Sequence, residues 1–140
     1  MATKGYPTYP FLPRITEDSL PFWQGCAQHE LRYQRCTHCG KPRMPASFLC
    51  PDCLSPDFVW EPSSGRGTLY SFVVFHRAFH PALADRIPYA VAAVDLDEGV
   101  RLLTNLIDFD YDTTIKCGIV VEVGFVDAGN GIVLPVFHRT

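Results

Sequence analysis

Four of the six cysteines in this 140-residue chain lie in one stretch, "CTHCGKPRMPASFLCPDC", residues 36–53. They form two Cys-x-x-Cys pairs with ten residues between them. Each pair presents two thiolates from one tight turn, and Zn²⁺ favours a tetrahedron of four such soft ligands. Gly40 can adopt the positive φ that the first turn needs. We therefore predict a closed, structural zinc site whose ligands are Cys36, Cys39, Cys50 and Cys53.

Other uses of the cysteine pairs are weaker predictions. Iron in place of zinc stays possible. Haem attachment is excluded, because Gly40 and Leu54 stand where a histidine would follow each pair. A redox pair is disfavoured, because no βαβ pattern surrounds the motif. The amino-terminal residues contain no apolar signal segment and apolar runs reach only about five residues, so we expect a cytoplasmic chain without a membrane span, in which thiols stay reduced.

The residues before the cysteines suggest an arm and a helix. Residues 1–16 carry prolines at a period of three between aromatic residues, which favours an extended arm, with a floppy tail as the alternative. Residues 17–29 predict a short helix that Asp18 or Ser19 can cap. Its shared apolar face would contain Leu20, Trp23 and Ala27. Residues 31–62 would be the ribbon with its flanking strands.

From Gly67 onward the pattern is that of β-strands. The expected strands cover residues 68–75, 89–96, 101–109, 119–126 and 132–138. Asp97-Glu98-Gly99 and the two-residue Asn130-Gly131 predict turns, and residues 110–116 a short helical turn. Pro135 places the last strand at an edge or a bulge. Five strands interrupted after the third predict an OB-fold, a small Greek-key barrel.

The expected fold class is therefore mainly β, with an amino-terminal helix and a rubredoxin-like four-cysteine ribbon ahead of a five-stranded OB-fold barrel. The expected divisions are an arm over residues 1–16, helix and ribbon over 17–66, and barrel over 67–140.

The first barrel strand is apolar on both faces. Leu69, Val73 and Phe75 can line the barrel, yet Tyr70, Phe72 and Val74 on the other face are apolar too. A half-buried strand should have one polar face. We expect the outer face to be covered either by the ribbon and helix or by a partner protein.

A zinc ribbon joined to an OB-fold also suggests nucleic-acid binding. Charge argues against it, because residues 67–140 carry five Lys/Arg against nine Asp/Glu, a balance of −4, and the whole chain is −3. Phosphate backbones are usually met by a positive surface.

Catalytic motifs are absent from the sequence. The candidate nucleophiles are Cys26 and Cys117, and the candidate bases are His29, His76, His80 and His138. Nothing in their spacing groups them into a known triad, and a small apolar role fits both cysteines better. A chain that hydrolyses acyl-CoA alone remains a third interpretation.

One loop and one glycine-flanked arginine are the remaining candidates. "HRAFHPAL", residues 76–83, places His76, Arg77, Phe79 and His80 between two predicted strands, and Arg66 lies between Gly65 and Gly67. Such residues can bind a partner or a phosphate group. A solvated loop and a flexible joint are the plain alternatives.

The order of motifs resembles a known family. "PFWQG", "HELRYQRCTHCGKPRMPASFLCPDCLS", "SGRGTLYSFVVFHRAFHP" and "PYAVAAVDLDEGVRLLTNL" are similar to zinc-ribbon and OB-fold proteins long described as a domain of unknown function. The resemblance covers roughly residues 20–138 and places the family's four cysteines on the four named above.

That resemblance implies a function. Family members are typically small partner subunits of thiolase-like acyl-CoA enzymes, in which the larger subunit carries the catalytic residues. It implies a non-catalytic accessory subunit, a CoA thioester as substrate of the complex, and two copies of each chain. Thiolysis, condensation and retro-aldol cleavage, in aromatic or steroid degradation, are all compatible with it. Under this interpretation Arg66, His76, Arg77, Phe79 and His80 would contact the partner or CoA.

Overall fold

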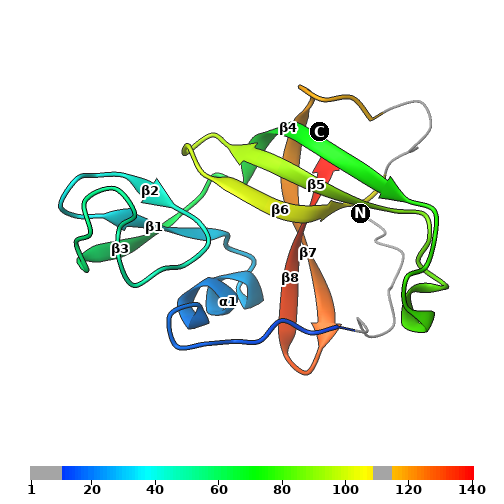
Figure 1. The fold of residues 1–140 in the computed structure, drawn as a ribbon, viewed down its shortest axis with the longest axis horizontal. Coiled ribbons are helices and arrows are strands. Elements are labelled where there is room, and N and C mark those ends of the chain that lie inside the picture. The colour runs from blue at the N-terminus through cyan, green and yellow to red at the C-terminus, as the bar shows by residue number, and fades with distance from the viewer. Residues whose placement is uncertain (1–10, 109–114) are drawn as a thin grey trace.

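The computed structural model describes residues 11–108 and 115–140 and consists of a small three-stranded sheet beside a five-stranded barrel (Figure 1). Helix α1 (Leu20–Ala27) precedes the small sheet, whose strands are β1 (Arg32–Cys36), β2 (Pro42–Arg43) and β3 (Phe58–Pro62). The barrel contains β4 (Arg66–Phe75), β5 (Tyr89–Leu96), β6 (Arg101–Leu106), β7 (Val120–Gly129) and β8 (Ile132–Arg139), with a 3₁₀ turn, η1 (Pro81–Leu83), between β4 and β5. The mainly β prediction is confirmed.

The barrel has the connectivity of an OB-fold. Its strand order is β4-β5-β6-β8-β7, and β7 pairs with β4 to close it. All neighbours are antiparallel except β6 and β8, whose ladder contains the one pair Leu106↔Phe137 among the described residues. Pro135 lies in the part of β8 that pairs with β7 and precedes this contact, so its missing N–H breaks no ladder with β6.

The predicted turns are present where they fall within the described residues. Asn130 and Gly131 join β7 to β8 with φ of 55° and 75°, the left-handed pair that a two-residue hairpin loop requires. Gly99, with φ of 92°, closes the turn between β5 and β6. Most of the helical turn predicted over residues 110–116, and of the arm over 1–16, lies outside the described part; residues 11–16 form neither helix nor strand.

Helix α1 is shorter than predicted and buries a different face. Gly25 and Cys26 are its buried residues, whereas Leu20 is 42% exposed and Ala27 is exposed, so the predicted apolar face is wrong. The chain reverses directly after the helix, and Glu30 N–H donates to the Gly25 carbonyl at 2.8 Å. A Cβ on Gly25 would lie 2.6 Å from the Glu30 carbonyl oxygen. The side of helix α1 on which Gly25 lies, where no side chain projects, therefore packs against the rest of the protein.

The amino-terminal cap also differs from the expected one. Ser19 occupies the cap position, but its side chain makes no capping hydrogen bond. Its hydroxyl instead donates to the Thr16 carbonyl at 3.2 Å and accepts from the Thr16 N–H at 3.0 Å. Ser19 thus stabilises the turn that leads into the helix.

The predicted inward face of the first barrel strand is wrong beyond Leu69. Pairing of β4 with β5 shifts around Tyr70, which is an extra residue in β4, a β-bulge. One extra residue reverses the alternation of side chains after it. Leu69 is fully buried as predicted, but Val73 is 53% exposed, and Phe72 and Val74 pack against the core in its place.

The small sheet and the barrel share one core and are fastened at their junction. Leu31 and Tyr33, at the start of the ribbon, belong to the same buried cluster as barrel residues such as Phe137. Glu98, in the β5–β6 turn, accepts hydrogen bonds through Oε1 from the Ser63 hydroxyl and from the Ser64 N–H, the latter at 2.7 Å. These contacts fix the ribbon relative to the barrel.

Among the described residues, no helix is both long and apolar enough to cross a membrane.

Candidate functional site: a four-cysteine metal centre

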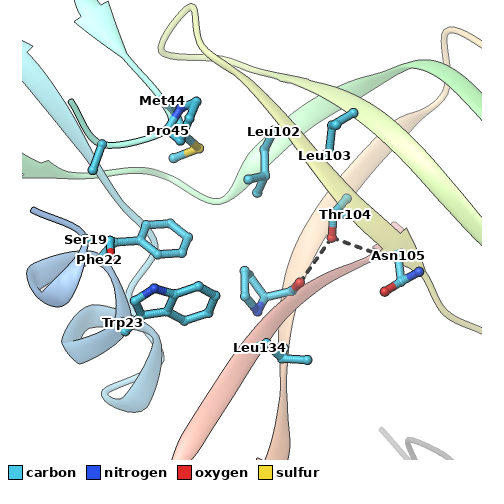
Figure 2. A pocket seen from close by; sticks show the side chains of 12 residues that line it. Ser19, Phe22, Trp23, Met44, Pro45, Leu102, Leu103, Thr104, Asn105 and Leu134 are labelled. Atoms are coloured by element: carbon cyan, nitrogen blue, oxygen red, sulfur yellow. Dashed lines mark hydrogen bonds between the residues drawn. The ribbon is translucent and has the colours of Figure 1, made fainter. Parts of the chain in front are cut away.

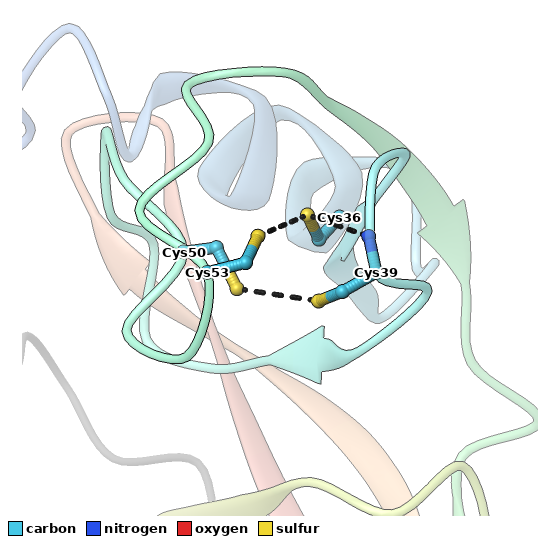
Figure 3. Close-up of side chains that lie close together, drawn as sticks. All are labelled: Cys36, Cys39, Cys50 and Cys53. Atoms are coloured by element: carbon cyan, nitrogen blue, oxygen red, sulfur yellow. Dashed lines mark hydrogen bonds between the residues drawn. The ribbon is translucent and has the colours of Figure 1, made fainter.

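The four predicted ligands come together at one point of the ribbon (Figure 3). The Sγ atoms of Cys36, Cys39, Cys50 and Cys53 all lie within 4.8 Å of one another. The Cys36–Cys53 and Cys39–Cys50 Sγ pairs are each 3.6 Å apart. A tetrahedral ion with metal–sulfur bonds of about 2.3 Å places its ligands about 3.8 Å apart, so the arrangement fits zinc.

Two matching turns position these sulfur atoms. Gly40 N–H donates to the Cys36 carbonyl and Leu54 N–H donates to the Cys50 carbonyl, both at 2.9 Å. The residue after each pair has a positive φ, 78° for Gly40 and 63° for Leu54. The sequence indicated this conformation for Gly40. It gave no sign of it for Leu54, because leucine rarely adopts it.

Backbone N–H groups favour the thiolate form of one ligand of the cluster, Cys36. The N–H groups of Cys39 and His38 lower the pKa of the Cys36 thiol to about 6, although burial opposes them. At Cys53 the Ser55 N–H also acts to lower the pKa, but burial and the neighbouring thiols outweigh it and raise the pKa to about 12. Four thiolates this close repel one another, so the cluster ionises fully only around a cation.

The candidate nucleophiles do not form a catalytic group in the described part of the chain. Cys26 is fully buried, and burial raises the pKa of its thiol to about 12, while Cys117 is exposed. His29 stacks on Phe125 with ring centroids 5.0 Å apart. His80 accepts the Ala82 N–H through Nδ1 at 3.1 Å. The His29 N–H donates to the Cys26 carbonyl at 2.9 Å, but among the described residues no histidine ring hydrogen-bonds either thiol.

The structure does not bring Arg66 together with the 76–83 loop. Arg66 is at the start of β4 and pairs with Glu122 at 2.8 Å, whereas the loop follows the end of that ten-residue strand. At about 3.3 Å per residue the strand separates them by about 30 Å. In the loop, the Arg77 guanidinium lies 5.3 Å from the centroid of the Phe79 ring, and Phe79 is 69% exposed.

A groove that the sequence did not indicate lies where helix, ribbon and barrel meet (Figure 2). Its volume is about 340 Å³. It is lined by Ser19, Phe22, Trp23, Met44, Pro45, Ala46, Leu102, Leu103, Thr104, Asn105, Leu134 and Pro135. The Thr104 hydroxyl spans the gap between β6 and β8 by donating to the Pro135 carbonyl at 3.1 Å. No charged side chain is among the described lining residues.

The barrel continues this apolar surface on its outer face. Leu103, which also lines the groove, is 74% exposed, and Val73 and Tyr70 are 53% and 55% exposed. The Arg101 guanidinium lies 3.7 Å from the centroid of the Tyr70 ring and pairs with Asp95 at 2.6 Å. The ribbon and helix therefore leave part of the outer face uncovered.

Comparison with known proteins matches both parts of the chain. Residues 23–59 match the rubredoxin-like zinc ribbon domain of ChsH2, and residues 60–126 match the ChsH2 C-terminal OB-fold domain. The chain belongs to the ChsH2 family. A solved structure of this family, "Ltp2-ChsH2(DUF35) aldolase", superposes with a TM-score of 0.82 at 36% identity, covering 91% of this chain and 98% of the ChsH2-type chain.

Curated relatives of the ChsH2 family add context. A probable enoyl-CoA hydratase alpha subunit of Thermomonospora curvata is 38% identical over 126 residues, 90% of this chain. This chain spans only 39% of that relative's length. The benzoylsuccinyl-CoA thiolase subunit BbsA of Thauera aromatica is 34% identical over 76 residues, which are 54% of this chain and 51% of BbsA. The match to the Thermomonospora curvata subunit therefore spans most of the ribbon and barrel, whereas the match to BbsA covers about half of this chain.

Proposed function

We propose that this chain is a non-catalytic accessory subunit of a thiolase-like acyl-CoA enzyme. The observation that carries this proposal is the match to 98% of a chain in the solved structure "Ltp2-ChsH2(DUF35) aldolase". That structure is an aldolase of which Ltp2 is also a part. A relative that is a subunit of a CoA thiolase supports the same role. The hydratase activity of the longer relative is not carried over, because most of that protein lies outside the match.

The described residues support a non-catalytic role in two ways. Among the described residues, neither the buried Cys26 nor the exposed Cys117 has a hydrogen bond from its thiol to a basic side chain, which fits a complex whose thiol chemistry another chain supplies. The uncharged groove and the exposed Leu103, Val73 and Tyr70 form an apolar surface larger than scattered single side chains. Such surfaces mark protein–protein interfaces.

In this proposal Cys36, Cys39, Cys50 and Cys53 hold one zinc ion. Zinc bound by four thiolates has no open coordination position, and it contributes folding energy to the ribbon. The CoA thioester is the substrate of the complex, and the assembly contains two copies of each chain. Thiolysis, condensation and retro-aldol cleavage all remain within the proposal.

Co-expression with the thiolase-like protein encoded beside this chain tests the assignment. We expect a stoichiometric complex that buries well above about 1,000 Å² per interface, with acyl-CoA turnover in the complex and none in the separate chain. Expressed alone, the chain should aggregate because its apolar surface lacks cover. A fully soluble monomer without affinity for that protein would refute the proposal. Salt-dependent binding to random single-stranded DNA would support the nucleic-acid interpretation in its place.

For the 76–83 loop we propose partner docking, because arginine beside an exposed aromatic ring is typical of interface hot spots. His76 and His80 flank Arg77 and Phe79 in this role. Arg66 lies at the other end of β4 and pairs with Glu122, so we do not include it in this docking loop. It remains a separate candidate for a partner or CoA phosphate, for which the ion pair would have to open.

Replacing Arg77 with alanine separates docking from CoA binding. Docking predicts a weaker complex whose surviving fraction keeps the same KM for the CoA substrate. CoA binding predicts intact assembly with KM raised about tenfold. Normal assembly with normal kinetics would show that the loop has neither role.

A further inference from the structure

Arg43 is a buried arginine without a carboxylate partner in the described part of the chain. It is 6% exposed, and its Nε donates to Gln34 Oε1 at 2.9 Å while Nη2 donates to the Ser47 carbonyl at 2.8 Å. Its Nη1 and the Nε2 of the fully buried Gln34 have no hydrogen-bond partner among the described residues. The neutral acceptors around it therefore do not balance a full positive charge.

A buried guanidinium such as that of Arg43 is stabilised by a negative charge nearby. Removing a guanidinium from water costs several kcal/mol unless an opposite charge or a full set of acceptors replaces the water. Elsewhere in the ribbon the cations have carboxylate partners. Lys41 Nζ lies 2.6 Å from Asp52, and Arg35 Nε lies 2.9 Å from Glu61. Arg43 differs from both in being buried and in lacking such a partner.

The register of the small sheet places Arg43 on the face that carries the metal centre. Arg43 pairs with Gln34 and Phe58 pairs with Cys36, and paired residues of a sheet point to the same side. Gln34 and Cys36 are two positions apart on β1, so they also share that side, about 7 Å apart along the strand. The Arg43 guanidinium lies 4.8 Å from the centroid of the Phe58 ring, beside the strand pair that contains Cys36.

With zinc bound, the four-cysteine centre would supply the negative charge that Arg43 lacks. Four thiolates around Zn²⁺ carry a net charge of −2, whereas the four protonated thiols are neutral. Across a buried distance of this order an opposite charge remains strongly felt, because few water molecules lie between. The loaded centre is thus a strong negative charge on the face that Arg43 shares.

We propose that Arg43 is the buried counter-charge of the zinc–thiolate centre, and this inference rests on the zinc site proposed above. Arg43 touches no ligand sulfur, so it acts through the field it adds and not as a ligand. The same charge disfavours the metal-free ribbon, where among the described residues only neutral acceptors and the Phe58 ring face it. Zinc binding and the burial of Arg43 therefore stabilise each other.

The test uses two variants. Arg43→Met replaces the unbranched aliphatic part of the side chain but removes the charge, and Arg43→Lys keeps the charge. Arg139→Met is the matched control, because it removes the same charge at an exposed position in the barrel, outside the ribbon. Zinc affinity is measured by competition with a chromophoric chelator on the full-length chain, within its complex if it purifies in one. Unfolding with and without zinc is measured on the same samples.

We expect Arg43→Met to weaken zinc binding by about 10- to 100-fold, the range found for residues that support metal ligands from outside the coordination sphere. Arg43→Lys should recover most of this loss, and Arg139→Met should leave the affinity within about threefold of the unmodified chain. The stabilisation that zinc confers should shrink in Arg43→Met and stay unchanged in the control.

Other results overturn the inference. If Arg43→Met lowers stability equally with and without zinc and leaves the zinc affinity unchanged, Arg43 has only a packing and hydrogen-bonding role. If Arg43→Lys fails to recover affinity while Arg43→Met loses it, the guanidinium geometry matters and the charge does not. If the unmodified chain binds no zinc, the zinc site itself is wrong, a failure distinct from the first two.

Discussion

Replacing Glu98 with alanine should loosen the junction between ribbon and barrel. Glu98 Oε1 accepts from the Ser63 hydroxyl and the Ser64 N–H, and the Ser64 hydroxyl adds a longer contact at 3.3 Å. A hydrogen bond to a charged group contributes about 1.5–3 kcal/mol, and bonds that share one acceptor are not additive. Because Glu98 is only half-buried, we expect a loss of about 3 kcal/mol in the free energy of unfolding.

Urea denaturation followed by circular dichroism measures this loss as a lower midpoint at an unchanged slope. The control is Asp97→Ala, since Asp97 is the exposed neighbour whose side chain makes no hydrogen bond or ion pair within the described chain. It should change stability by less than about 0.5 kcal/mol. The groove combines residues of helix, ribbon and barrel, so the Glu98 variant should also bind its partner more weakly. A Glu98 variant as stable as the control would refute the role of this junction.

Three further outcomes are expected. Elemental analysis should find one zinc per chain, and Cys36→Ser should remove it and unfold the ribbon, because binding and folding are coupled; well-folded protein without metal would contradict this. Iodoacetamide should modify the native zinc-loaded chain at the exposed Cys117 and spare the buried Cys26, whose pKa is about 12, as mass spectrometry can verify. Hydrogen bonds from Arg35 and from the Tyr33 hydroxyl hold the pKa of Glu61 below its usual 4.5, so the stabilising contribution of Glu61 is present above that pH and lost as the pH falls through the lower folded value. Glu61→Gln should flatten this acid-induced loss in a pH series of thermal melts, and an unchanged acid profile would count against it.

The sequence predicted the features that depend on spacing and on turn chemistry. The two cysteine pairs, the positive φ of Gly40 and the Asn130-Gly131 hairpin are each determined by a few adjacent residues. The four ligand sulfur atoms meet because both turns are built locally. The five-stranded barrel architecture also followed, since five strands with one interruption leave few alternatives.

The features that the sequence missed depend on contacts between distant residues. Tyr70 looks like an ordinary strand residue, and both faces after it are apolar, so no pattern marks the bulge. Side-chain polarity predicts one buried face for helix α1, but the close approach of Glu30 to Gly25 decides which side is buried. Arg43 looks like a surface arginine in the sequence. Only the pairing of β2 with β1 reveals that it is buried.

The bulge at Tyr70 decides which side of β4 each later side chain takes. If Tyr70 paired with Ala93 without a bulge, strict alternation would exchange the two sides of the residues up to Phe75. Val73 would then turn into the barrel, and Phe72 and Val74 would turn out to the solvent. Deleting Tyr70 would instead remove the extra residue and leave Phe72 opposite Ala92 and Val73 opposite Val91, each on its present side. Within this family, relatives that lack one residue at this bulge should therefore keep the same inward positions after it.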